Sequence, residues 1–127
     1  MTKVTISTEN APAPVAAYAQ AARKGNILQV AGQVSIDPKT GEVVGTTVAE
    51  QARQTVRNLE AVLDGAGASL DDVVMMRVYL TDTAHFAEFN ETYNALVREP
   101  FAARTTVYVG LPAGLLVEID ALAVLDS

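Results

Sequence analysis

Hydrophobic residues recur along this chain with two different periods, which predict strands in some segments and helices in others. Residues 18–23 and 27–34 are strand-like and flank Lys24-Gly25-Asn26. Glycine and asparagine tolerate positive φ, so this polar turn predicts a β-hairpin. Residues 9–14 include two prolines, which remove backbone donors and hold their neighbours extended, and they predict a loop before the hairpin.

A first helix is predicted from residue 47 onwards. Thr47 and Glu50 have the spacing of a capping box, in which the hydroxyl and the carboxylate each bind free backbone N–H groups at a helix start. The apolar positions that follow have the helical period and define one face: Val48, Ala52, Val56, Leu59, Leu63 and Ala66. Gly65 and Gly67 are expected to end this helix.

The second half of the chain predicts a strand, a helix and a second hairpin. Residues 73–81 are rich in β-branched residues, and this strand would place Val74, Met76, Val78 and Leu80 on one face. The next helix is expected to begin at Asp82-Thr83 and to end before Pro100, with an inner stripe formed by Phe86, Phe89, Tyr93, Leu96 and Val97. Strands 104–109 and 115–125 flank a turn-forming stretch. Residues 1–127 therefore predict one α+β domain, a mixed or antiparallel sheet with two helices packed on one face.

The last predicted strand has two unlike faces. Its odd-numbered positions from 115 to 125 are all apolar and are expected to pack against the helices. Its even-numbered positions combine Leu116, Leu122 and Val124 with Glu118 and Asp120. An apolar face that carries two carboxylates is typical of a surface covered by another subunit, with the acids kept for a paired or functional role.

Arg104 is the candidate partner of these acids, because it lies on the preceding predicted strand. Antiparallel pairing across a five-residue turn would place Arg104 opposite Asp120 and Thr106 opposite Glu118, so that Arg104 and Glu118 become diagonal neighbours. A guanidinium in a cleft can bind a substrate carboxylate through two hydrogen bonds, and a nearby glutamate can hold or activate water. The same residues could equally form a structural ion pair without a ligand.

The amino-acid composition of the chain disfavours several kinds of binding partner. The net charge of −6 and the absence of a basic cluster among nine Lys and Arg residues disfavour nucleic acid. With no cysteine and with His85 as the single histidine, a zinc site is not expected. No segment reads as a signal peptide or a membrane span, so we expect a cytoplasmic protein with no membrane partner. A mean hydropathy of +0.20 in so short a chain indicates apolar area hidden between subunits.

Short motifs are spread in order over nearly the whole chain. They are Ser7-Thr8-Glu9-Asn10-Ala11-Pro12, Ala31-Gly32-Gln33-Val34, Asp37-Pro38-Lys39-Thr40-Gly41-Glu42, Gln51-Ala52-Arg53-Gln54-Thr55, Val78-Tyr79-Leu80-Thr81-Asp82, Phe86-Ala87-Glu88-Phe89-Asn90-Glu91-Thr92-Tyr93, Phe101-Ala102-Ala103-Arg104-Thr105-Thr106 and Val117-Glu118-Ile119-Asp120-Ala121-Leu122-Ala123. Each motif is weak alone. Their order and spacing together resemble the RidA-type (YjgF-type) enamine/imine deaminases.

The resemblance implies a chorismate-mutase-like fold and a homotrimer whose active sites lie in clefts between adjacent subunits. It implies hydrolysis of 2-enamino and 2-imino acids, such as 2-aminoacrylate, 2-iminobutyrate and 2-iminopropionate, to 2-keto acids and ammonia, without metal or organic cofactor. Arg104 matches the arginine that binds the substrate carboxylate, and Glu118 matches the acid that positions the hydrolytic water. The implied substrate-binding residues are Tyr18, Gly32, Asn90 and Thr106.

Two other classes of function remain open. A non-catalytic trimer could bind small carboxylates or keto acids in the same clefts and regulate a partner protein. An RNA-directed or chaperone-like role is the third hypothesis, and the acidic net charge counts against its RNA version.

Overall fold

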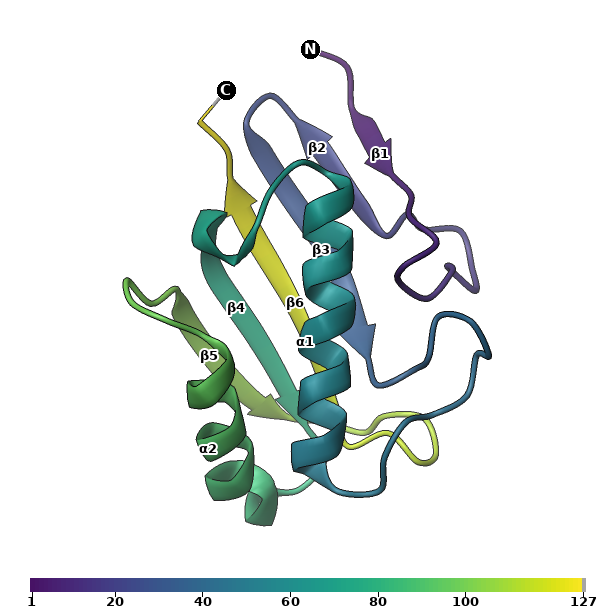
Figure 1. The fold of residues 1–127 in the computed structure, drawn as a ribbon, viewed down its shortest axis with the longest axis vertical. Helices are drawn as coiled ribbons and strands as arrows, with labels where there is room; N and C mark the ends of the chain where they lie inside the picture. The colour runs from purple at the N-terminus through teal and green to yellow at the C-terminus, as the bar shows by residue number, and fades with distance from the viewer. Residues whose placement is uncertain (127) are drawn as a thin grey trace.

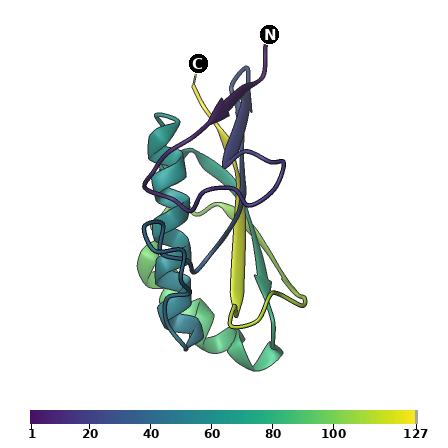
Figure 2. The same cartoon turned by 90° about the vertical axis from the view of Figure 1, so that its right-hand side faces the viewer.

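The computed structural model describes residues 1–126, which form one six-stranded sheet with two α-helices on one of its faces (Figures 1 and 2). The elements along the chain are β1 (Val4–Ile6), β2 (Ala21–Lys24), β3 (Ile27–Val34), α1 (Val48–Gly65), β4 (Val73–Leu80), α2 (Phe86–Leu96), β5 (Ala103–Tyr108) and β6 (Val117–Val124). Short 3₁₀ turns, Leu70–Asp72 and Thr83–His85, precede β4 and α2. The predicted α+β class, with a mixed sheet and both helices on one face, is confirmed.

The strand order is β1-β2-β3-β6-β4-β5. The last strand, β6, enters the middle of the sheet and is antiparallel to both β3 and β4, whereas β4 and β5 are parallel neighbours joined through α2. The predicted hairpin of the two final strands is therefore wrong. The turn residues between β5 and β6 indicate a change of direction, but they do not determine which strands become partners.

The core lies between the helices and the sheet face that they cover. The odd-numbered residues of the last strand, from Leu115 to Leu125, are all buried, as predicted. The capping box also forms: the Thr47 hydroxyl accepts a hydrogen bond from the backbone of Glu50, whose carboxylate accepts one from the backbone of Thr47. Helix α1 ends at Gly65, in agreement with the expected stop.

Two strand assignments differ from the prediction. The β2–β3 hairpin turns at Gly25 and Asn26 as expected, but β2 begins at Ala21 and not at residue 18. The Gln20 side chain binds backbone groups of residues 8–12 and thereby holds the preceding segment as a loop. In β4, the pairing with β6 is irregular between Val73 and Met75, so that Val73 is buried and Val74 is exposed.

None of the helices that residues 1–126 form has both the length and the apolar character needed to cross a membrane.

Candidate functional site

Arg104 lies on the edge strand β5, on the sheet face covered by the helices. Its register partner on β4 is Met76, which is buried in the core. The Arg104 Nη2 atom donates a hydrogen bond of 2.6 Å to Asn90 Oδ1 on α2. No carboxylate within residues 1–126 forms an ion pair with Arg104. Most of its five N–H donors are therefore available to an anion.

Aromatic side chains of α2 surround this guanidinium. Its central carbon lies 4.9 Å from the centroid of the Tyr93 ring, 5.5 Å from that of Phe89 and 6.0 Å from that of Phe86. These distances are within the range of cation–π attraction. Phe86, predicted as part of the inner stripe, is 40% exposed because it lies at the end of α2 beside Arg104 and not over the core. Burial raises the pKa of Tyr93, which keeps its hydroxyl protonated.

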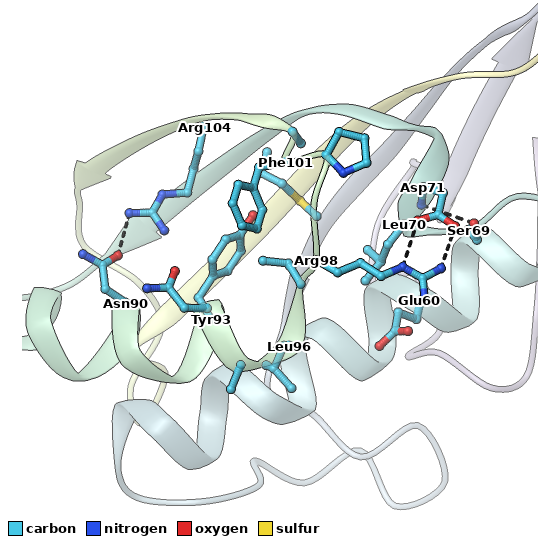
Figure 3. A pocket seen from close by; sticks show the side chains of 16 residues that line it. Glu60, Ser69, Leu70, Asp71, Asn90, Tyr93, Leu96, Arg98, Phe101 and Arg104 are labelled. Atoms are coloured by element: carbon cyan, nitrogen blue, oxygen red, sulfur yellow. Dashed lines mark hydrogen bonds and ion pairs between the residues drawn. The ribbon is translucent and has the colours of Figure 1, made fainter.

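An open cavity of about 670 Å³ runs from Arg104 to an ion pair between Arg98 and Asp71 (Figure 3). Arg104 and Asn90 lie at one end and the ion pair at the other, with Tyr93 and Phe101 between them. The cavity is lined by Glu60, Ser69, Leu70, Asp71, Met76, Asn90, Tyr93, Asn94, Ala95, Leu96, Val97, Arg98, Pro100, Phe101, Ala102 and Arg104. This is a concave space with a cation at its end, the form that an anionic small molecule requires.

Thr106 lies two residues after Arg104 on the same face of β5, with buried Val78 as its register partner. Its Oγ1 atom is buried and finds no hydrogen-bond partner in the part of the chain that the structure describes. A buried hydroxyl without a partner costs free energy, so this oxygen is available to a ligand that reaches it.

Glu118 lies on the opposite face of the sheet, next to Gly32. A Cβ atom placed on Gly32 would overlap the Glu118 carboxylate and would lie 2.9 Å from its Cδ atom. The pairing of β3 with β6 is irregular between Val30 and Gln33, at this point of contact. Burial, and secondly the charge of Asp120, raise the pKa of Glu118. Across residues 1–126 its carboxylate has no hydrogen-bond or ion-pair partner.

The predicted contact between Arg104 and Glu118 is wrong. Strand β4 separates their two strands, and the side chains alternate so that Arg104 is on the helix side and Glu118 on the outer side. Asp120 pairs with Arg77 of β4, with 2.7 Å between Arg77 Nε and Asp120 Oδ1, and Glu118 is the register partner of Tyr79. The sequence pattern did not single out Arg77 and Tyr79, although both are polar residues on the face of the predicted 73–81 strand that is opposite its apolar face.

The six predicted site residues therefore fall into two groups and one separate residue. Arg104 and Asn90 are in contact, with Thr106 beside them, and Gly32 and Glu118 are in contact on the other face. Tyr18 is 51% exposed in the loop before β2, where its hydroxyl accepts a long hydrogen bond of 3.5 Å from the backbone of Val15. One chain thus carries the Arg104 guanidinium and the Glu118 carboxyl on opposite faces of the sheet, not on a common surface.

Within residues 1–126, no three His, Cys, Asp or Glu side chains gather closely enough to hold a metal ion. The chemistry available to the two groups is electrostatic binding of an anion and transfer of a proton.

Comparison with known proteins identifies what the chain resembles as a whole. Residues 8–125 match the family model described as endoribonuclease L-PSP. A RutC family protein of Pyrococcus horikoshii is 48% identical over 95% of this chain and 97% of its own length. The 2-iminobutanoate/2-iminopropanoate deaminase of Escherichia coli is 43% identical over 94% of this chain and 96% of its own. The crystal structure of RidA from an Antarctic Psychrobacter superposes with a TM-score of 0.91 at 41% identity, covering 96% of this chain and 99% of that one.

Proposed function

The chain belongs to the endoribonuclease L-PSP family, which includes the RidA and YjgF proteins, and on this premise we propose that it hydrolyses reactive 2-imino acids and their 2-enamine tautomers to 2-keto acids and ammonia. The observation that supports this best is the Arg104 guanidinium, which lies at the end of an open cavity and has, within residues 1–126, one amide partner and no carboxylate partner. The name of the Escherichia coli relative supplies the substrate class, 2-iminobutanoate and 2-iminopropanoate.

Arg104 would bind the carboxylate that every such substrate carries. Nη2 is held by Asn90, and the Tyr93 and Phe89 ring centroids lie 4.9 and 5.5 Å from the guanidinium carbon, so these contacts restrict the position of the guanidinium before the ligand arrives. A planar fork matches a carboxylate through two parallel hydrogen bonds. The Thr106 hydroxyl, which has no hydrogen-bond partner among the described residues, offers a further hydrogen bond on the same face of β5.

Glu118 would act as the base for water. The water oxygen adds to the imine carbon while Glu118 takes one of the water protons and passes it to the imine nitrogen, which gives a neutral carbinolamine. Glu118 then takes the carbinolamine hydroxyl proton and passes it to the nitrogen, so that the C=O bond forms as the C–N bond breaks. Ammonia leaves, the 2-keto acid is the other product, and the Glu118 carboxylate is regenerated. The imine carbon is already electrophilic, so a bound carboxylate and a positioned water supply what the reaction needs.

Because Arg104 and Glu118 lie on opposite faces of the sheet, we propose that each complete site is built from two copies of the chain. One copy contributes Arg104, Asn90 and Thr106, and its neighbour contributes Glu118, Gly32 and Tyr18. The outer face of the sheet is suited to such an assembly, since both helices lie on the other face and Ile27 and Val107 are exposed on the outer one. A homotrimer with three equivalent interfaces, as in the family resemblance, would form three sites.

Turnover is tested by coupling a purified threonine dehydratase to this protein in the presence of semicarbazide. Faster imine hydrolysis removes the imine that semicarbazide traps, so the semicarbazone yield should fall. Arg104→Ala should abolish this effect, whereas Arg53→Ala, which removes an exposed arginine of α1, should preserve it. If the wild-type protein leaves the yield unchanged but a keto acid raises its melting temperature, the non-catalytic binding protein is the better description. An RNA mobility shift without any ligand effect would favour the third hypothesis.

The shared site is tested by mixing two inactive variants. In a trimer formed from Arg104→Ala and Glu118→Gln chains, every mixed assembly regains one interface with both residues intact. Random co-assembly of equal amounts should restore about a quarter of wild-type activity, since about three in four trimers are mixed and each has one of three sites. A mixture that stays inactive although mass spectrometry shows mixed trimers would refute a site built from two copies.

A further inference from the structure

A hydrogen-bonded network centred on Asp120 lies beside Glu118 on the outer face of the sheet. The Asp120 carboxylate accepts from Arg77 Nε at 2.7 Å and from Tyr79 Oη at 2.7 Å. Gln29 Nε2 approaches the same carboxylate at 3.5 Å, and Gln29 Oε1 accepts from Arg77 Nη2 at 3.2 Å. The Asp120 side chain is 13% exposed, whereas the Arg77 side chain is 46% exposed, so the carboxylate is largely removed from water while the guanidinium remains partly solvated. None of the steps proposed above uses this network.

The network divides the local donors unequally between two carboxylates. Asp120 and Glu118 are two residues apart on β6 and point to the same face. Asp120 holds both the guanidinium of Arg77 and the phenol of Tyr79, whereas Glu118 receives neither, although Tyr79 is its direct register partner. Arg77 is diagonal to Glu118 across the β4–β6 pair, a separation that a long side chain can span.

We propose that Asp120 is a positioning residue for the hydrolysis, because it holds Arg77 and Tyr79 away from Glu118 and so leaves the Glu118 carboxyl free to take up and release a proton. This inference rests on the proposed function, since it assigns a purpose to the free carboxyl. If Arg77 paired with Glu118 instead, the ion pair would stabilise the carboxylate and weaken it as a base.

The charged and titratable groups that face Glu118 lie on β6 itself, on β4 and, in the proposed assembly, on a second copy of the chain. Asp120 lies on the same strand, and Arg77 and Tyr79 lie on β4. The facing segment of β3, residues 32–34, carries no titratable group. The hydrogen bond to Asp120 raises the pKa of Tyr79, so Tyr79 remains a protonated donor. In the proposed assembly, Arg104 of a second copy also approaches Glu118, but it is the same in every variant compared below.

Two substitutions should move the pKa of Glu118 in opposite directions. Asp120→Asn keeps the shape of the side chain but removes its charge and releases Arg77, and both effects favour ionised Glu118, so its pKa should fall. Arg77→Met leaves the Asp120 charge uncompensated beside Glu118, so the pKa should rise. A shift of about half a pH unit or more is expected for each, given one charge at cross-strand distance in a partly buried setting.

The measurement is a ¹³C NMR titration of the Glu118 carboxyl carbon in the assembled protein, together with the pH profile of kcat/KM. The acidic limb of the profile should follow the NMR titration, moving to lower pH in Asp120→Asn and to higher pH in Arg77→Met. Asp64→Asn is the matched control, because it removes one exposed carboxylate from α1, on the other side of the sheet, and should move neither. Native mass spectrometry verifies that each variant keeps its assembly.

Opposite shifts of the Glu118 titration in the two variants establish the inference. Shifts of the same sign, or none beyond that of Asp64→Asn, overturn it, since a merely structural network would change stability and not the direction of titration. The NMR titration does not depend on turnover. If the wild-type protein fails to hydrolyse imines while the titrations move in opposite directions, the proposed function is at fault and the electrostatic role of Asp120 stands.

Discussion

Gly32→Ala should separate catalysis from folding more clearly than any other single substitution in this protein. The added methyl group would overlap the Glu118 carboxylate and would lie 2.9 Å from its Cδ atom, where ordinary carbon contacts begin near 3.4 Å. The carboxyl group must therefore move away, because the methyl group is fixed to the β3 backbone. A displacement of about 1 Å in a reacting group can cost about a hundredfold in rate, or about 2.7 kcal/mol of transition-state stabilisation.

Folding should respond in the opposite sense. Gly32 is exposed, and its φ lies outside the left-handed region, so alanine can adopt the same backbone conformation. A glycine-to-alanine change at such a position lowers the entropy of the unfolded chain and contributes about 0.4–1 kcal/mol of stability. The melting temperature should therefore stay the same or rise slightly, while kcat/KM in the dehydratase-coupled assay falls about a hundredfold.

Gly110→Ala is the matched control, because within residues 1–126 no atom beyond its two chain neighbours lies within 4 Å of the Cβ position at Gly110. This variant should keep wild-type turnover. Full activity in Gly32→Ala, with a crystal structure showing Glu118 displaced, would refute the argument that the position of this carboxyl limits the rate.

Three further substitutions test the binding group, the helix start and the assembly. Asn90→Ala removes the one side chain that accepts a hydrogen bond from Arg104 within residues 1–126, and kcat/KM should fall about tenfold, about 1.4 kcal/mol, in the coupled assay. In Glu50→Gln the helix cap loses its charge. Hydrogen bonds from the backbones of Thr46 and Thr47 lower the pKa of Glu50, so its contribution to stability is present above the pKa of the unfolded chain and is lost as the pH falls through the lower, folded pKa. The variant should therefore melt at a lower temperature than wild type at pH about 7, and the difference should vanish at pH about 2, as measured by circular dichroism. Leu122→Lys places a charge on the outer sheet face, and the mass by light scattering should fall from that of the proposed trimer towards that of one chain; an unchanged mass would show that this face is not the interface.

The local elements could be predicted because their causes are local. Thr47 and Glu50 form the predicted capping box since both partners lie within one helical turn. Gly25 and Asn26 form the predicted turn because their backbone preferences need no distant partner. The odd-numbered face of β6 is buried as predicted because strict alternation determines which side of a strand can be covered.

The candidate site could be predicted only in part. The motif resemblance selected Arg104 and Asn90, and the structure joins them by a hydrogen bond although they are on different elements. The strand pattern, by contrast, paired Arg104 with the wrong strand, because antiparallel pairing across the turn assumed that consecutive strands are neighbours. Arg77 and Tyr79 were missed for the same reason, since their importance depends on β6 lying next to β4.

The sequence by itself determined the order and approximate position of the main helices and strands and which face of the last strand is apolar, and it selected the residues that we propose carry the chemistry. Tertiary structure alone decided that β6 enters between β3 and β4, and therefore that Arg104 and Glu118 lie on opposite faces. The physical reason is that periodicity and turn chemistry act over a few residues. The choice of a strand's partner instead depends on the packing of the whole sheet against α1 and α2, which no short segment encodes.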